Sequence, residues 1–200
     1  MYEFIEGNLE MISPTHAVIA NQGMGYHISI SLTTYERIKG QKQARLFIEL
    51  TFKIENQSPT AMVLYGFSDP AEREMFRLLT SVSGVGNNTG LLMLSSLDSE
   101  SLSSAILNGN VGLLKSIKGI GEKTAQRIVL ELRDKLGGKK FKFHATGSAE
   151  AGSNMEEALN ALSVLGYNKA AAEKALLKVS KDLGGSATVE ELIKNSLKIL

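Results

Sequence analysis

A nine-residue pattern occurs twice in the middle of the chain, and this repeat constrains the fold more than any other feature. Residues 78–86 read LLTSVSGVG and residues 113–121 read LLKSIKGIG, a spacing of 35 residues. Each copy predicts a helix, a tight turn and a second helix. The two glycines permit the unusual dihedrals of the turn, and the Val or Ile between them fills the groove between the helices. We therefore expect two helical hairpins in tandem.

The turn of each hairpin is predicted to bind a DNA phosphate. The amides of the turn and of the first residues of the next helix point outward, and the helix dipole adds positive potential. Contacts between amides and phosphates fix position without reading bases, so the binding is expected to be independent of sequence. The residues predicted to bind DNA are Gly84, Val85, Gly86, Asn87 and Asn88 in the first hairpin, and Lys118, Gly119, Ile120, Gly121, Lys123, Thr124 and Arg127 in the second.

The two hairpins differ in charge. Lys118, Lys123 and Arg127 belong to the second hairpin, and cations of this kind supply affinity by releasing counterions from DNA. The first hairpin has Asn87 and Asn88 at the start of its second helix, so binding there depends on amides. The formal net charge of the chain is only +1, and a DNA-binding surface therefore requires cations that cluster locally.

The N-terminal third is predicted to be a small β-barrel. Short runs rich in β-branched and aromatic residues lie at 2–5, 17–20, 26–30, 46–52 and 60–67. Turn residues separate them, the last at 56–59. Five strands in a segment of this length suit an OB-fold, a barrel that often binds oligonucleotides.

Helical patterns follow the barrel. Asp69, Pro70 and Glu72 predict a helix start, with a capping side chain, a proline in the first turn and an acid near the positive end of the dipole. Three more helices are predicted near the C-terminus, starting at Asn154, Lys169 and Thr188, the first and the third with capping boxes. The expected protein is a multidomain α+β chain. Its expected parts are an OB-fold at 1–67, a tandem hairpin domain at 68–136, a flexible linker at 137–153 and a three-helix bundle at 154–200.

The residues predict no catalytic, metal or cofactor site. The chain has no Cys, and His16, His27 and His144 are scattered, whereas a metal site needs clustered ligands. A Walker-type loop is missing as well. No apolar run approaches the roughly 20 residues of a membrane span, and the acidic N-terminus does not resemble a secretory signal. We expect a cytoplasmic protein that is not an enzyme. Two alternatives stay open: a nuclease or glycosylase that holds DNA with its hairpins, and a general DNA-binding repair protein.

Several motifs together resemble the bacterial RuvA family. They are LYGF at 64–67, the two hairpins with GIGEKTAQR at 119–127, GMGY at 23–26 and ALSVLGY at 161–167, and they span essentially the whole chain in order. The resemblance implies an OB-fold, a double helix-hairpin-helix domain and a small three-helix, UBA-like domain. It also implies a non-catalytic subunit that holds a four-way (Holliday) junction open and planar during recombination and DNA repair.

The resemblance also implies partners. A homotetramer, or two tetramers facing each other, would hold the junction, and RuvC resolvase belongs to the same system. The RuvB ATPase would bind at the C-terminal domain, where the matching residues are Leu162, Leu165, Gly166 and Tyr167.

This chain departs from the family pattern at three positions. Glu55 matches an acidic pin between the last two strands, in a loop lengthened by residues 57–59, where the family usually carries two acids. Asn88 and Glu122 stand where basic residues are usual. Each missing phosphate contact is expected to weaken binding by ~1 kcal/mol and to leave the hairpin fold intact.

Overall fold

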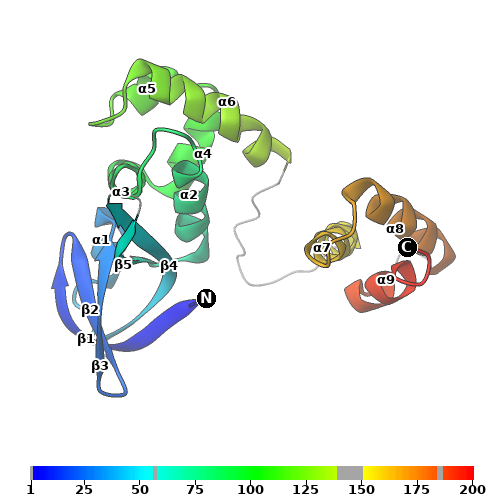
Figure 1. Cartoon of the computed structure of the whole chain (residues 1–200), viewed down its shortest axis with the longest axis horizontal. Coiled ribbons are helices and arrows are strands. Elements are labelled where there is room, and N and C mark those ends of the chain that lie inside the picture. The colour runs from blue at the N-terminus through cyan, green and yellow to red at the C-terminus, as the bar shows by residue number, and fades with distance from the viewer. Residues whose placement is uncertain (1, 56–57, 139–150, 184–186) are drawn as a thin grey trace. The chain divides into compact units, whose positions relative to one another are not determined.

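The computed structural model describes residues 2–55, 58–138, 151–183 and 187–200. The chain divides into two compact units, residues 1–143 and 144–200 (Figure 1). The first unit contains a barrel and a helical region, each with its own apolar core, and the second has a third core.

The first unit begins with a closed barrel whose hydrogen-bonded strand order is β1-β2-β3-β5-β4. The strands are β1 (Phe4–Ser13), β2 (His16–Asn21), β3 (Met24–Ile30), β4 (Gln43–Glu55) and β5 (Ser58–Phe67). Strands β3 and β5 are parallel, and the other neighbours are antiparallel. A helix, α1 (Leu32–Ile38), lies between β3 and β4 in the chain. This arrangement confirms the predicted five-stranded barrel of the OB type.

Two parts of the barrel differ from the prediction. Helix α1 was not expected, although Ser31 is a capping residue and its side chain accepts from the Thr34 amide. Strand β1 runs to Ser13, well beyond the predicted 2–5. Its first half pairs with β4 and its second half with β2, and a register shift between Leu9 and Met11 lets it bend from one partner to the other.

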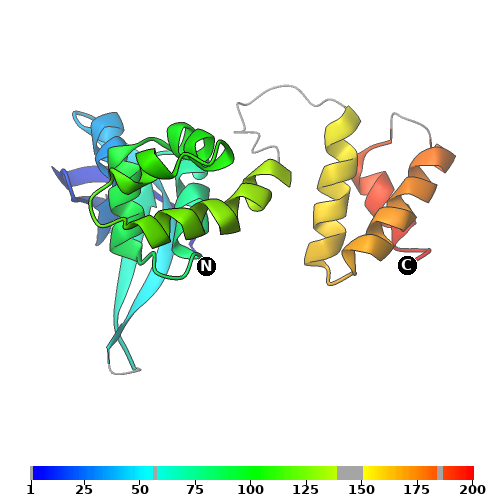
Figure 2. The ribbon, with the colours of Figure 1, turned by 90° about the horizontal axis from the view of Figure 1, so that it is seen from above.

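Strands β4 and β5 continue past the barrel as a two-stranded ribbon (Figure 2). Ser58 and Pro59 belong to β5 and pair with Glu55 and Ile54, so the turn predicted over 56–59 is wrong for these two residues. Pro59 is tolerated because the register shifts beside it. Residues 56 and 57 and the side chain of Glu55 lie outside the described part of the molecule.

The helical region contains α2 (Pro70–Thr80), α3 (Asn87–Ser96), α4 (Ser99–Leu107), α5 (Val111–Lys115) and α6 (Glu122–Gly138). The predicted start of α2 is confirmed, since the Asp69 side chain accepts from the Glu72 amide and Pro70 is the first helical residue. Helix α6 runs through Gly137 and Gly138, two residues that were expected in the linker; residues 139–150 lie outside the described ranges.

Buried polar contacts fix helix α2 to the barrel. The carboxylate of Glu72 accepts hydrogen bonds from Ser31, from Thr34 at 2.7 Å and from Ser68. Burial raises the pKa of this carboxyl, while the hydrogen bonds from its neighbours act in the opposite direction. Arg77 Nε donates to Glu49 Oε2 on β4 at 2.6 Å. The hairpins are thus held on the barrel and form one unit with it.

The second unit contains α7 (Ala151–Val164), α8 (Lys169–Leu183) and α9 (Val189–Ser196). The capping box of Thr188 and Glu191 is confirmed. The predicted cap at Asn154 is wrong, because α7 begins three residues earlier and Asn154 Nδ2 donates to the Ala187 carbonyl at 3.1 Å. Asn154 therefore joins α7 to the segment that precedes α9.

Candidate nucleic-acid interface

The two hairpin turns make the same backbone hydrogen bonds. Each pair of equivalent bonds agrees in length to within about 0.1 Å. The pairs are Val82 N to Leu79 O (3.1 Å) with Ile117 N to Leu114 O (3.2 Å), Val85 N to Val82 O (3.0 Å) with Ile120 N to Ile117 O (3.1 Å), and Gly90 N to Gly86 O (2.9 Å) with Ala125 N to Gly121 O (2.9 Å). The repeat in the sequence is therefore a repeat in three dimensions.

The two glycines of each turn have different roles. Gly84 and Gly119 have φ of 94° and 90°, which favours glycine. Gly86 has an ordinary φ of −81°, and a Cβ atom added at Gly86 or Gly121 would meet nothing within 4 Å. The expectation that dihedral angles require both glycines is wrong for the second one. The missing side chain there leaves the backbone open to approach from outside.

Some amides of each turn are free, and others are used inside the protein. Val85 N and Ile120 N donate within their turns, so the expectation of outward amides is wrong for these two residues. The amides of Gly84 and Gly86 donate to no group in the part of the chain that the structure describes. Gly86 is the N-cap residue of helix α3 and has no side chain to cap it, so the first amides of the helix are left without partners. In the second turn the amides of Gly119 and Gly121 likewise donate to no described group, so each turn presents a small set of free N–H donors, here called its amide cradle.

Both hairpins are built on one core. Val85 and Ile120 are buried in the same apolar cluster, with exposed fractions of 4% and 5%, and they fill the space between helices as the sequence predicted. Because one core carries both turns, the separation between the two amide cradles is fixed.

The asparagines of the first hairpin contact the barrel. Asn87 Nδ2 donates to Thr51 Oγ1 at 3.1 Å, and Asn88 Oδ1 accepts from Tyr65 OH at 3.4 Å. Their side chains therefore hold α3 against β4 and β5. The amides of this helix start remain as the groups that could bind a phosphate.

Two lysines of the second hairpin are available to a ligand. Lys118 and Lys123 are exposed, and neither forms an ion pair or hydrogen bond with the described residues. Glu122, which stands between them, accepts from Lys115 Nζ at 2.7 Å. This hydrogen bond lowers the pKa of Glu122. The pairing offsets the negative charge that Glu122 places beside the cradle.

Helix α6 also brings two cations to the turn of the first hairpin. Arg127 Nη1 donates to the Ser83 carbonyl at 3.1 Å, and Lys135 Nζ lies 3.5 Å from Ser81 Oγ. The sequence did not reveal this proximity, because the paired residues are 44 and 54 positions apart.

Comparisons with known proteins match this architecture along the whole chain. Three family models match consecutive parts: the RuvA N terminal domain at residues 1–66, a SAM-like helix-hairpin-helix tandem at 76–134 and the RuvA C-terminal domain at 153–200. A protein of Flavobacterium psychrophilum named Holliday junction branch migration complex subunit RuvA is 42% identical over 200 residues. Proteins of the same name from Bacteroides fragilis and Cytophaga hutchinsonii are 41% identical over 208 residues and 42% over 205. Each comparison covers all of both chains.

The chain belongs to the RuvA family. This confirms the resemblance drawn from the motifs. The matches also follow the order of barrel, hairpins and C-terminal helices, which is the order expected for RuvA proteins.

The residues that the resemblance to RuvA assigns to binding of the RuvB ATPase, here called the motor, differ in their exposure to solvent. Leu165 and Tyr167 are exposed, at 59% and 39%, beside Gly166, which has φ of 94° and follows the end of α7. Leu162 is completely buried in the core of the second unit, where a partner cannot contact it. This is a correction: Leu162 supports the packing of α7, and the exposed pair beyond it is left as the candidate contact.

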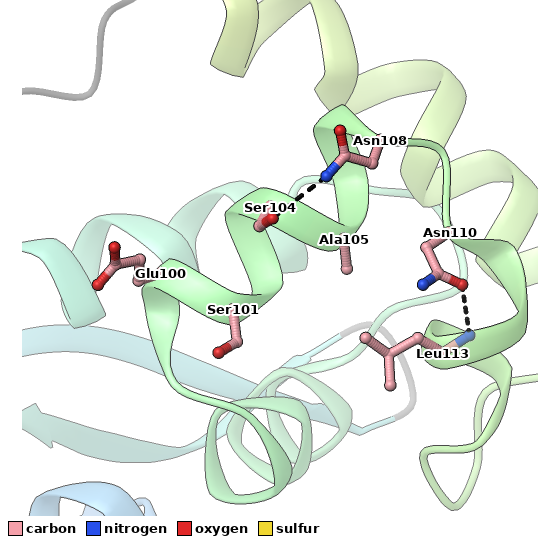
Figure 3. A pocket seen from close by; sticks show the side chains of 7 residues that line it. All are labelled: Glu100, Ser101, Ser104, Ala105, Asn108, Asn110 and Leu113. Carbon is pink, nitrogen blue, oxygen red and sulfur yellow. Dashed lines mark hydrogen bonds between the residues drawn. The ribbon is translucent and has the colours of Figure 1, made fainter.

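A shallow hollow of about 430 Å³ lies between α4 and the start of α5 (Figure 3). Two of its polar side chains are engaged locally, since Asn108 Nδ2 donates to Ser104 Oγ at 3.3 Å and Asn110 Oδ1 accepts from the Leu113 amide at 3.0 Å. Its lining contains one carboxylate, Glu100. This set offers neither the paired carboxylates nor the nucleophile and base that catalysis would need.

Two further observations bear on other classes of function. Within the described residues, no group of three or more His, Cys, Asp or Glu side chains could hold a metal ion. None of the helices in the same residues has the length and apolar character that a membrane span requires.

The two glycines of the first turn are expected to respond differently to alanine. Gly84→Ala should lower the free energy of unfolding by about 1–2 kcal/mol, because φ of 94° is strained for an L residue. Gly86→Ala should cost less stability than Gly84→Ala and should weaken DNA binding, because its Cβ has space within the protein but stands beside the amide cradle. Thermal unfolding and a binding titration with each variant measure the two effects. Equal DNA affinity of Gly86→Ala and the unmodified chain would show that this amide is not approached.

Proposed function

We propose that this RuvA-family chain binds four-way junction DNA without reading its sequence, as the non-catalytic DNA-binding subunit of a branch-migration complex. The observation that carries the proposal is the pair of hairpins with matching turns on one core. Each turn presents free amides, and Lys118 and Lys123 flank the second cradle. Amides and lysines of this kind position phosphates and do not distinguish bases.

The names of the relatives support the same function, since each is called a Holliday junction branch migration complex subunit. In such a complex the ATP-dependent work belongs to the partner, RuvB. We infer that RuvB binds the second unit at Leu165, Gly166 and Tyr167, because an exposed apolar pair on a separate core can dock without disturbing the hairpins.

We further infer that several copies act together, as a homotetramer or as two tetramers facing each other on the junction, with RuvC as a later partner. One chain has a net charge of only +1, so repetition of a modest site is the route to high affinity. Glu55 ends β4 on the ribbon that projects from the barrel. In a symmetric assembly such ribbons could place acidic groups at the centre of the junction, where they would repel phosphates.

The proposed division of the chain follows from these roles. Residues 1–67 carry the ribbon, 68–136 bind DNA, 137–153 connect the two units, and 154–200 bind the motor. The helices α6 and α7 extend into the connecting range from both sides.

A band-shift titration with matched DNAs tests the proposed function. A four-way junction, a duplex and a single strand of the same length and base composition are compared at one salt concentration. We expect at least about tenfold tighter binding of the junction, a difference of about 1.4 kcal/mol, and no change when the arm sequences are permuted. Equal affinities would indicate a general DNA-binding repair protein. Cleavage of any of these DNAs in the presence of magnesium alone would indicate a nuclease.

A further inference from the structure

The Arg127 side chain is hydrogen-bonded to another part of the protein, although the sequence predicts that it is among the cations that contact DNA. Its Nη1 donates to the Ser83 carbonyl at 3.1 Å, and its Nε lies 4.0 Å from Glu131 Oε1. The side chain is half exposed (52%), so these contacts contribute little to the stability of the fold. Their main effect is on the geometry of the turn that contains Ser83.

The peptide group that Arg127 contacts is the one between Ser83 and Gly84. In a trans peptide group the C=O and N–H bonds point in opposite directions. A donor bound to the Ser83 carbonyl therefore also favours one direction of the Gly84 N–H. This amide has no acceptor in the described residues and belongs to the cradle of the first hairpin. A hydrogen bond at the carbonyl also polarises the peptide group and strengthens its amide as a donor.

Helix α6 connects the two cradles. Its first residue, Glu122, directly follows the second turn, and Arg127 and Lys135 further along contact the first turn. Glu131 lies four residues after Arg127, and its carboxylate partly neutralises the positive charge of the guanidinium. Lys118 and Lys123, in contrast, have no acceptor among the described groups. The lysines are therefore better placed than Arg127 to neutralise a phosphate.

We propose that Arg127 is a positioning residue, which orients the Gly84 amide toward a DNA phosphate and so couples the first hairpin to the second. Binding of phosphate by the hairpins rests on the proposed function; the orientation of the Gly84 amide by Arg127 is a property of the free protein. The phosphate-contacting cations are then Lys118 and Lys123.

The test compares Arg127→Gln with Lys123→Gln in the full chain. Both variants remove one positive charge from α6, and glutamine is too short to place its amide nitrogen where Arg127 Nη1 stands. The first measurement uses the free protein and records the NMR chemical shift and hydrogen exchange of the Gly84 amide. We expect both quantities to change in Arg127→Gln and to stay the same in Lys123→Gln, with similar melting temperatures for the two variants.

The second measurement is junction affinity as a function of salt concentration. Lys123→Gln should reduce the slope of log K against log salt by about 0.9 for each phosphate that the side chain neutralises. Arg127→Gln should weaken binding by about tenfold, the loss expected for one amide–phosphate hydrogen bond, and keep the slope of the unmodified chain. If Arg127 had only a structural role, its substitution would not alter the Gly84 amide selectively. It would also not lower junction affinity while leaving the salt slope unchanged.

Two results would overturn the proposal. One is an unchanged Gly84 amide in Arg127→Gln, and the other is a loss of slope equal to that of Lys123→Gln, which would make Arg127 a phosphate ligand. Failure of the proposed function gives a different result: the unmodified chain would bind junction and duplex equally, while the amide measurement would still decide whether Arg127 orients Gly84.

Discussion

Replacing Lys118 and Lys123 together by glutamate is expected to weaken junction binding by about a hundredfold or more, as the removal of two charge-assisted hydrogen bonds predicts. The two side chains are exposed, have no acceptor in the described residues, and flank the second amide cradle. Each substitution also places a negative charge where a phosphate would bind, so the effect should exceed that of neutral variants. Binding titrations at several salt concentrations measure the change, and the slope should fall by about 0.9 for each phosphate that is no longer neutralised.

A matched control is available on helix α8. Lys174 and Lys178 are also exposed, and Lys174→Glu with Lys178→Glu changes the net charge of the chain by the same amount. This control should bind the junction as the unmodified chain does, because it lies in the second unit. An equal loss of affinity in both double variants would show that net charge, and not the second hairpin, determines binding.

The second large effect is expected from a chain that ends after α6. Residues 1–138 should bind the junction with the affinity of the whole chain and fail completely to stimulate the ATPase activity of RuvB. The barrel and the hairpins have their own cores, and the core of the second unit is built from residues of α7 to α9 and the segments between them. Junction titration and an ATPase assay with RuvB and DNA measure the two functions separately.

Point variants of the full chain make the same test sharper. Leu165→Asp with Tyr167→Asp changes two exposed side chains and should abolish stimulation of RuvB without unfolding the second unit. Leu177→Asp on α8 is the control, since Leu177 is also exposed (50%) but lies within helix α8, away from the segment that follows α7. If the shortened chain of residues 1–138 lost junction binding, the proposed separation of DNA binding from RuvB binding would be wrong.

The parts of the fold predicted well are those whose signals are local. The cap at Asp69 followed by Pro70, and the capping box of Thr188 with Glu191, satisfy helix-end amides with side chains a few residues away. The prediction missed α1 and the full length of β1, whose extent depends on pairing with two separate strands. Asn154 carried the local signal of a cap, but α7 begins before it and a distant carbonyl binds its side chain.

The candidate site also has features that local sequence predicts and features that depend on tertiary contacts. The sequence by itself determined the two hairpin turns, because Gly84 and Gly119 and the apolar residues beside them specify a turn through local dihedrals and neighbouring bonds. Only the tertiary structure decided which side chains remain free to contact DNA or a protein partner. Asn87 binds the barrel, Arg127 binds the first turn and Leu162 is buried, whereas Lys118 and Lys123 stay exposed. These outcomes depend on contacts between residues far apart in the chain, and such contacts leave no local pattern in the sequence.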